Sequence, residues 1–167
     1  MSPDDERAHD ERSDRIDQET VAERLRSIEQ YLEYLGESNP YYEWLETEVQ
    51  SVERGTVRLR QPHTERVRPP EVGPSEGING GVLMTIADAA GMAAVLAEVL
   101  EPVPLATTGV NLSFHSGVDE AHIVTAETVD LGSTLATTRL TIVPESDSDA
   151  ADPQVIASGE ATARLFE

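Results

Sequence analysis

The sequence of 167 residues contains no cysteine. This absence excludes disulfide bonds, thiolate nucleophiles and zinc sites with cysteine ligands. Aromatic residues make up only 4% of the chain, and a hydrophobic core must therefore be built mainly from aliphatic side chains. A chain of this length has the size of a single domain and can bury one modest core.

Lysine is also missing. All 12 basic residues are arginines, against 32 acidic residues, and the formal net charge is -20. Nucleic acids and anionic membranes both bind clustered positive charge, and we therefore expect neither as a partner. The acidic residues are spread along the chain. In this respect the composition resembles that of proteins from salt-loving microbes, whose charged surface stays hydrated where salt screens the repulsion.

Residues 1–17 are almost entirely charged or small and polar. Such a segment has too few apolar side chains to offset the entropy of ordering, and we predict a disordered acidic tail. It also lacks the apolar run of a secretory signal. Residues 80–100 are long enough to cross a bilayer, but Asp88, Glu98 and many small residues argue against a membrane span. We therefore expect a cytoplasmic protein.

Hydrophobic periodicity predicts an amphipathic helix over residues 18–38. Apolar side chains recur there at three- and four-residue steps from Val21 to Leu35, and Gly36 supplies a stop signal. After a turn signal at residues 38–40, two runs are predicted to form strands, because Val57 and its neighbours alternate between apolar and charged. These runs are YYEWLETEVQSVERG and TVRLRQPHTERVRPP.

A second, far more apolar helix is predicted from about Asn79 to Leu100, where the following Glu101-Pro102 ends it. Four extended segments come after it. An antiparallel sheet that wraps around one apolar helix explains this order, and the many Ala and Gly residues of the helix allow the sheet to approach closely. The predicted class is therefore α+β, a hotdog fold with an extra N-terminal helix.

Asp88 is the one charge near the middle of this apolar helix. Its neighbours at helical spacing, Met84, Thr85, Gly91 and Met92, cannot neutralise it. A buried charge without a partner costs stability. Asp88 is therefore a candidate functional residue.

Three segments resemble the hotdog thioesterases of the phenylacetic-acid-pathway (PaaI) type: GINGGVLMTIADAAGMA, TTGVNLSFHSGV and VIASGEATARLF. The similarity covers about residues 42–167. In that family an acidic residue follows the His of a His-Gly-Gly turn by nine positions, and Asp88 follows Asn79 by nine. The resemblance implies a hotdog thioesterase domain over residues 40–167. It also implies acyl-CoA hydrolysis, without a metal or other cofactor, at a site shared between two subunits.

The resemblance implies a role for each matching residue. Asp88 acts as nucleophile or as general base towards water, while the N–H groups of Gly80 and Gly81 polarise the thioester carbonyl. Free N–H groups and the positive end of a helix dipole are suited to a developing oxyanion. Thr107 stands where the family has a Ser or Thr that orients the water, and Thr108 is the alternative in the other strand register. We expect the depth of the acyl pocket to depend on Met84, Met92, Val95 and Phe114.

Two departures from the family keep a second hypothesis open. The family's His is replaced by Asn79, which can donate a hydrogen bond but cannot carry a proton. The family's Asn six positions earlier falls on Gly73. These changes favour a non-catalytic protein that binds or senses acyl-CoA. A dehydratase acting on hydroxyacyl thioesters ranks lower, because no His lies near Asp88 in the helix.

Arg58 and Arg60 belong to the one local excess of positive charge in the chain. Guanidinium groups bind phosphates, and these two residues are candidates for holding those of coenzyme A. The alternative is ion pairing with acids on adjacent strands. The exposed edges of one curved sheet also predict a homodimer or a homotetramer.

Overall fold

The structure, a computed structural model, describes residues 18–69, 77–117 and 119–166. The predicted tail at 1–17 and the position of Gly73 lie outside the described residues. In chain order the elements are α2 (Gln18–Ser38), α3 (Pro40–Leu45), β1 (Glu48–Glu53), β2 (Thr56–Gln61), η1 (Glu65–Val67), α4 (Gly80–Val99), β3 (Leu105–Phe114), β4 (His122–Leu131), β5 (Leu135–Pro144), η2 (Glu145–Asp147) and β6 (Ala157–Leu165).

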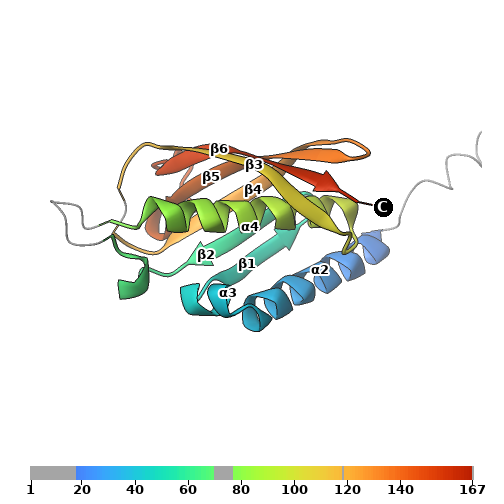
Figure 1. The fold of residues 1–167 in the computed structure, drawn as a ribbon, viewed down its shortest axis with the longest axis horizontal. Coiled ribbons are helices and arrows are strands. Elements are labelled where there is room, and N and C mark those ends of the chain that lie inside the picture. Colours follow the sequence, from blue (N-terminus) through green and yellow to red (C-terminus); the bar gives the residue numbers. More distant parts are fainter. Residues whose placement is uncertain (1–17, 70–76, 118, 167) are drawn as a thin grey trace, which may run out of the picture.

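The six strands form one antiparallel sheet in the order β1-β2-β4-β5-β6-β3. The sheet curves around α4, and α2 lies alongside β1 and contacts α4 (Figure 1). The predicted hotdog fold with an extra N-terminal helix is therefore confirmed. The core lies between α4 and the inner face of the sheet.

Helix α4 has caps at both ends. The side chain of Asn79 accepts a hydrogen bond from the backbone N–H of Gly81, and Leu100 ends the helix with a left-handed backbone, φ 63°. The helix packs through small side chains, among which Ala87, Ala90, Ala94 and Ala97 have no exposed surface. The sheet comes closest at Gly91, where an added Cβ would lie 2.9 Å from Thr138 Oγ1 and 3.0 Å from the Ala161 methyl. The expectation that small residues admit the sheet is thus met at atomic detail.

Helix α3 was not predicted, since residues 41–55 were expected to contain only a strand. Asn39 caps this helix by accepting a hydrogen bond from the N–H of Tyr41, and Pro40 occupies its first position. Asparagine followed by proline is a typical helix start. The dipeptide predicted a turn at the right place but also contained the signal for the helix that follows it.

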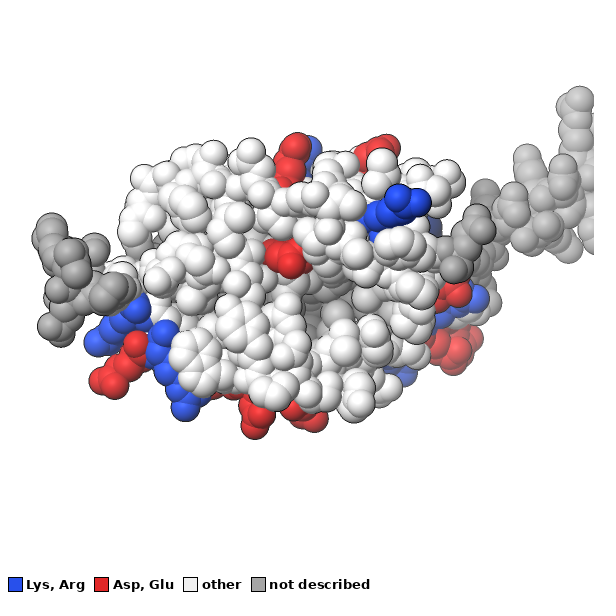
Figure 2. Space-filling view, viewed as in Figure 1, with Lys and Arg blue, Asp and Glu red and all other residues white. Residues whose placement is uncertain are grey.

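Strand β3 is one edge of the sheet, with β1 at the other, and among the described strands it pairs only with β6. Seven of its ten residues are exposed. The face of the molecule that carries β3 and α4 has charged side chains around its rim but only one acidic group near its centre (Figure 2). In a chain with a net charge of -20, such an uncharged face is unusual, and an open strand edge is a template for pairing with another chain.

His122 begins β4 and is fully buried. Among the described residues neither of its ring nitrogens has a hydrogen-bond partner. Burial, together with the nearby His63, lowers the pKa of His122 from its ordinary value of 6.5 to about 4. The ring is therefore neutral in the folded protein at all but acidic pH.

Gly91→Ala and Gly36→Ala test the close approach of the sheet to α4. Both glycines are helical, but an added Cβ at Gly36 meets nothing within 4 Å. We expect Gly91→Ala to lower the free energy of unfolding by about 1–3 kcal/mol through overpacking. Gly36→Ala should raise it by up to about 1 kcal/mol through helix propensity. Urea titrations measure both values, and equal effects of the same sign would contradict the packing described here.

Acid should destabilise the fold through His122. The unfolded chain binds this proton at a pKa near 6.5 and the folded chain only near 4. Between these values the unfolded state holds more protons, and stability falls as the pH falls. We expect this group to remove about 3 kcal/mol from neutral pH to about pH 4. Urea titrations of wild type and His122→Gln in high salt measure the difference, and an unchanged pH dependence in the variant would refute it.

Candidate functional site

Asp88 lies half-buried on the middle of α4, where it faces the edge strand β3. The hydroxyl of Thr107 donates a hydrogen bond to Asp88 Oδ1 at 2.6 Å. No described residue donates a hydrogen bond to the other carboxylate oxygen. The structure therefore brings together the two side chains that the sequence predicted as base and water-orienting hydroxyl.

A bulge in β3 decides between Thr107 and Thr108. The register against β6 shifts between Thr107 and Gly109, with Thr108 as the extra residue. The hydroxyl of Thr108 donates instead to the backbone oxygen of Thr162 at 3.2 Å and lies 2.9 Å from its hydroxyl. Bulges re-aim side chains in this way. Thr107, and not Thr108, faces the carboxylate.

The start of α4 offers one free donor of the two predicted. Asn79 Oδ1 accepts a hydrogen bond from the N–H of Gly81 at 2.8 Å. No described residue accepts from the N–H of Gly80, and the Phe114 ring lies 3.4 Å from where a Cβ on Gly80 would stand. Of the two N–H groups predicted as oxyanion donors, that of Gly80 is therefore free among the described residues. That of Gly81 is bound by the Asn79 side chain, which serves as a helix cap.

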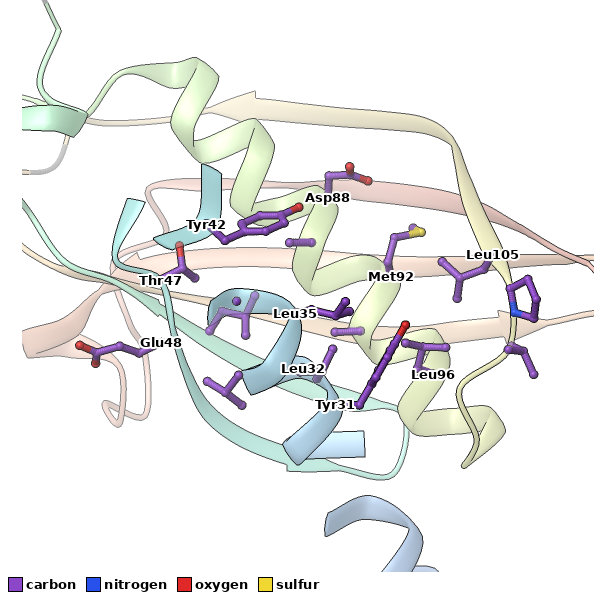
Figure 3. Close-up of a pocket in the computed structure, with 17 residues that line it drawn as sticks. Tyr31, Leu32, Leu35, Tyr42, Thr47, Glu48, Asp88, Met92, Leu96 and Leu105 are labelled. Atoms are coloured by element: carbon purple, nitrogen blue, oxygen red, sulfur yellow. The ribbon is translucent and has the colours of Figure 1, made fainter. Parts of the chain in front are cut away.

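A cavity of about 360 Å³ opens beside Asp88 and extends between α4 and α2. Its walls are mostly apolar, with Asp88 and Tyr42 at one end and Tyr31 and Leu96 towards the other (Figure 3). A volume of this size is typical of small-molecule sites. The lining residues are Tyr31, Leu32, Leu35, Gly36, Tyr42, Thr47, Glu48, Val49, Leu59, Asp88, Ala89, Met92, Ala93, Leu96, Val103, Pro104 and Leu105.

Tyr42 belongs to the site but was not predicted. Its ring is half-buried in the cavity wall, and burial and the negative charge of Asp88 raise the pKa of its phenol. The hydroxyl therefore stays protonated and can donate a hydrogen bond beside the carboxylate. Neighbouring Tyr41 holds this segment against α4 through its hydroxyl, 3.2 Å from Thr85 Oγ1. The start signal of α3 was the only clue in the sequence.

Of the residues predicted to shape the acyl pocket, Met92 alone lines the cavity. Val95 faces the other way and packs against Ala136 and Ala163 of the sheet. Phe114 covers the start of α4. Met84 lies one helical turn before Asp88 and is half-buried outside the cavity. The expected depth residues Met84, Val95 and Phe114 are therefore corrected, because the open space lies on the α2 side of α4.

Arg58 and Arg60 do not reach the cavity. They alternate along β2 with the buried Val57 and Leu59, and they point to the outer face of the sheet. Arg60 forms a two-pronged ion pair with Glu145, at 2.5 and 3.0 Å, and Arg58 lies 3.4 Å from Asp149. The structure shows the alternative, pairing with acids, for both residues, and their binding of coenzyme A phosphates stays a prediction.

Comparisons of the sequence with known proteins identify its family. The model of the thioesterase superfamily matches residues 77–151. A Halobacterium salinarum protein named "Putative esterase" is 32% identical over 126 residues, which cover 74% of this chain and 82% of that protein.

Solved structures share the fold. The PaaI protein of E. coli, from the phenylacetic acid degradation operon, superposes with a TM-score of 0.70 at 14% identity, over 86% of this chain and 96% of that one. A thioesterase of Haemophilus influenzae superposes with a TM-score of 0.68 at 17% identity, over 86% and 90% of the two chains. The sequence matches show that this chain belongs to the thioesterase superfamily, and the fold is the hotdog fold of these structures.

Proposed function

We propose that the protein hydrolyses acyl-CoA thioesters to the free acid and coenzyme A. The observation that carries this proposal is the Asp88 carboxylate, which Thr107 orients at the mouth of an apolar cavity. A carboxylate with one oxygen anchored and the other free can take a proton from water or attack a carbonyl. The cavity beside it accepts the apolar group that an acyl thioester carries.

As general base, Asp88 removes a proton from a water molecule while the water oxygen attacks the thioester carbonyl. The tetrahedral intermediate then collapses, the C–S bond breaks, and the thiolate of coenzyme A leaves and takes up a proton. As nucleophile, Asp88 attacks the carbonyl carbon instead, the C–S bond breaks and the thiolate of coenzyme A leaves and takes up a proton. Water then hydrolyses the resulting mixed anhydride, which releases the acid and restores the carboxylate. Thr107 holds the carboxylate in place, and the position of the carboxylate is compatible with both routes.

The carbonyl oxygen becomes negatively charged during the attack and then needs a hydrogen-bond donor. The geometry of α4 limits where that donor can come from. Gly80 precedes Asp88 by eight residues, and at the helical rise their backbones lie roughly 12 Å apart. One carbonyl cannot touch both groups of the same chain. We therefore propose a dimer in which the Gly80 N–H of one subunit serves the Asp88 of the other.

The surface of the subunit supports this dimer. The β3 edge is open, most of its residues are exposed, and the face around it has little charge (Figure 2). Pairing of β3 with its copy buries that edge and sets the two α4 helices next to each other. A homotetramer built from two such dimers remains part of the proposal.

A non-catalytic acyl-CoA-binding role is the second candidate. Asn79 favours it, because its side-chain oxygen accepts from the Gly81 N–H in the helix cap, and its amide group can donate a hydrogen bond but cannot carry a proton. A binding protein would gain heat stability from acyl-CoA without releasing thiol. The oriented carboxylate of Asp88 favours hydrolysis instead.

Asp88→Asn and Thr107→Val test the proposed chemistry in a free-thiol assay with acyl-CoA substrates in high salt. Loss of the carboxylate should lower kcat by about 10²–10⁴-fold, the usual contribution of a general base. Thr107→Val should lower kcat by a smaller factor of roughly 10, because the carboxylate remains but is no longer oriented.

Thr108→Val is the matched control, since Thr108 bonds to Thr162 and not to Asp88. It should retain wild-type kcat. Thiol release by Asp88→Asn at the wild-type rate would exclude the proposed role. Heat protection by acyl-CoA without thiol release from the wild type would select the binding protein.

A further inference from the structure

The two ends of the cavity beside Asp88 differ in their lining residues. Asp88, Tyr42 and Thr47 lie towards one end of it, while Leu96 and Leu105 line the other end, where Tyr31 contributes a hydroxyl (Figure 3). No basic side chain of the described residues lines it. The phosphates of coenzyme A therefore have no counter-charge there, and the cavity suits the acyl part of a substrate whose thioester lies at Asp88.

The empty space arises from small side chains on α4. Ala89 and Ala93 both line the cavity, and neither extends beyond a methyl group. Protein cores are normally packed without voids of this size. A face of a core helix that stays open over about two turns, from Asp88 to Leu96, is shaped for an occupant.

Helix α2 forms the outer wall of this space. It contributes Tyr31, Leu32 and Leu35, and only Ile28 of its 21 residues is buried. Tyr31 and Leu35 are each 37% exposed, so their side chains are not fixed by the core. A wall that is loosely packed on its own domain gains contacts when the cavity fills.

We propose that α2 closes the acyl end of the cavity and that Tyr31 and Leu35 set the length of the acyl chain that the protein accepts. A water molecule's share of liquid volume is about 30 Å³ and a methylene group is of similar size, so 360 Å³ holds on the order of ten carbons. The preferred substrate class is thus a medium-length apolar acyl thioester. This inference rests on the proposed hydrolysis at Asp88.

Tyr31→Ala and Leu35→Trp test the inference in the full-length protein. The measurement is kcat/KM over acyl-CoA substrates of about four to sixteen carbons. Tyr31→Ala should move the optimum to longer chains, with a gain of up to about fourfold for each methylene newly accommodated, as burial of that group predicts. Leu35→Trp enlarges the wall and should move the optimum to shorter chains.

Tyr34→Ala is the matched control, because Tyr34 lies on the same helix, is 63% exposed and does not line the cavity. It should leave the chain-length profile unchanged. Loss of helix stability alone would change the chain-length optimum of Tyr31→Ala and Leu35→Trp in the same direction. The proposal predicts that the two optima move in opposite directions. Profiles that coincide for Tyr31→Ala, Leu35→Trp and Tyr34→Ala would overturn it.

A binding experiment separates this inference from the proposed reaction. Free fatty acids of the same lengths are titrated against each variant, and heat protection is read as the shift in Tm. If no thioester is hydrolysed but Tyr31→Ala and Leu35→Trp shift the preferred fatty acid in opposite directions, the proposed function fails and the acyl cavity stands. If the α2 variants hydrolyse thioesters with the chain-length preference of the wild type, the proposed function is supported and the proposed role of α2 is refuted.

Discussion

The packing of the sheet around α4 is the constraint on which the rest of the structure depends. A helix wrapped on most sides must present small residues to the strands, and Gly91 is placed where even one methyl group would collide with Thr138 and Ala161. Ala89 and Ala93, which are also small, line the cavity on the α2 side of the helix. Small residues on two faces of α4 thus explain both the close packing of the core and the open space of the cavity.

The constraint also explains how a charge is tolerated in the most apolar segment of the chain. Asp88 lies on the one side of α4 that the sheet leaves open, between the edge strand and the cavity. Thr107 supplies a hydrogen bond at 2.6 Å, which offsets part of the cost of desolvating the carboxylate. The bulge in β3 turns that hydroxyl towards the helix. Thr107 thus binds one carboxylate oxygen, and no described residue donates a hydrogen bond to the other.

Much of the fold could be predicted from the sequence because its signals are local. Apolar composition and the Glu101-Pro102 stop defined α4, and period-two alternation indicated the strands. The resemblance placed Asp88, and Thr107 was predicted with Thr108 as its rival. The structure supplied the bulge that separates them, which depends on pairing with β6 and leaves no local mark.

The cavity could not be predicted in the same way. Its walls come from α2, the β1 region, α4 and the start of β3, and only their packing shows which side chains meet. For this reason Phe114 and Val95 were placed wrongly and Tyr42 was missed. The ion pair of Arg60 likewise depends on Glu145 in η2, 85 residues further along the chain, and that of Arg58 depends on Asp149, 91 residues further along.

The central claim is that one active site uses Asp88 of one subunit and the Gly80 N–H of the other. Asp88→Asn and Gly80→Pro each remove one of these groups, and proline is well suited to the first position of a helix. The two inactive variants are refolded together from urea, and thiol release is measured.

Half of the dimers are then mixed, and each has one intact site, so roughly a quarter of wild-type activity should return. A mixture no more active than its two components, or full activity in Gly80→Pro alone, would contradict the account.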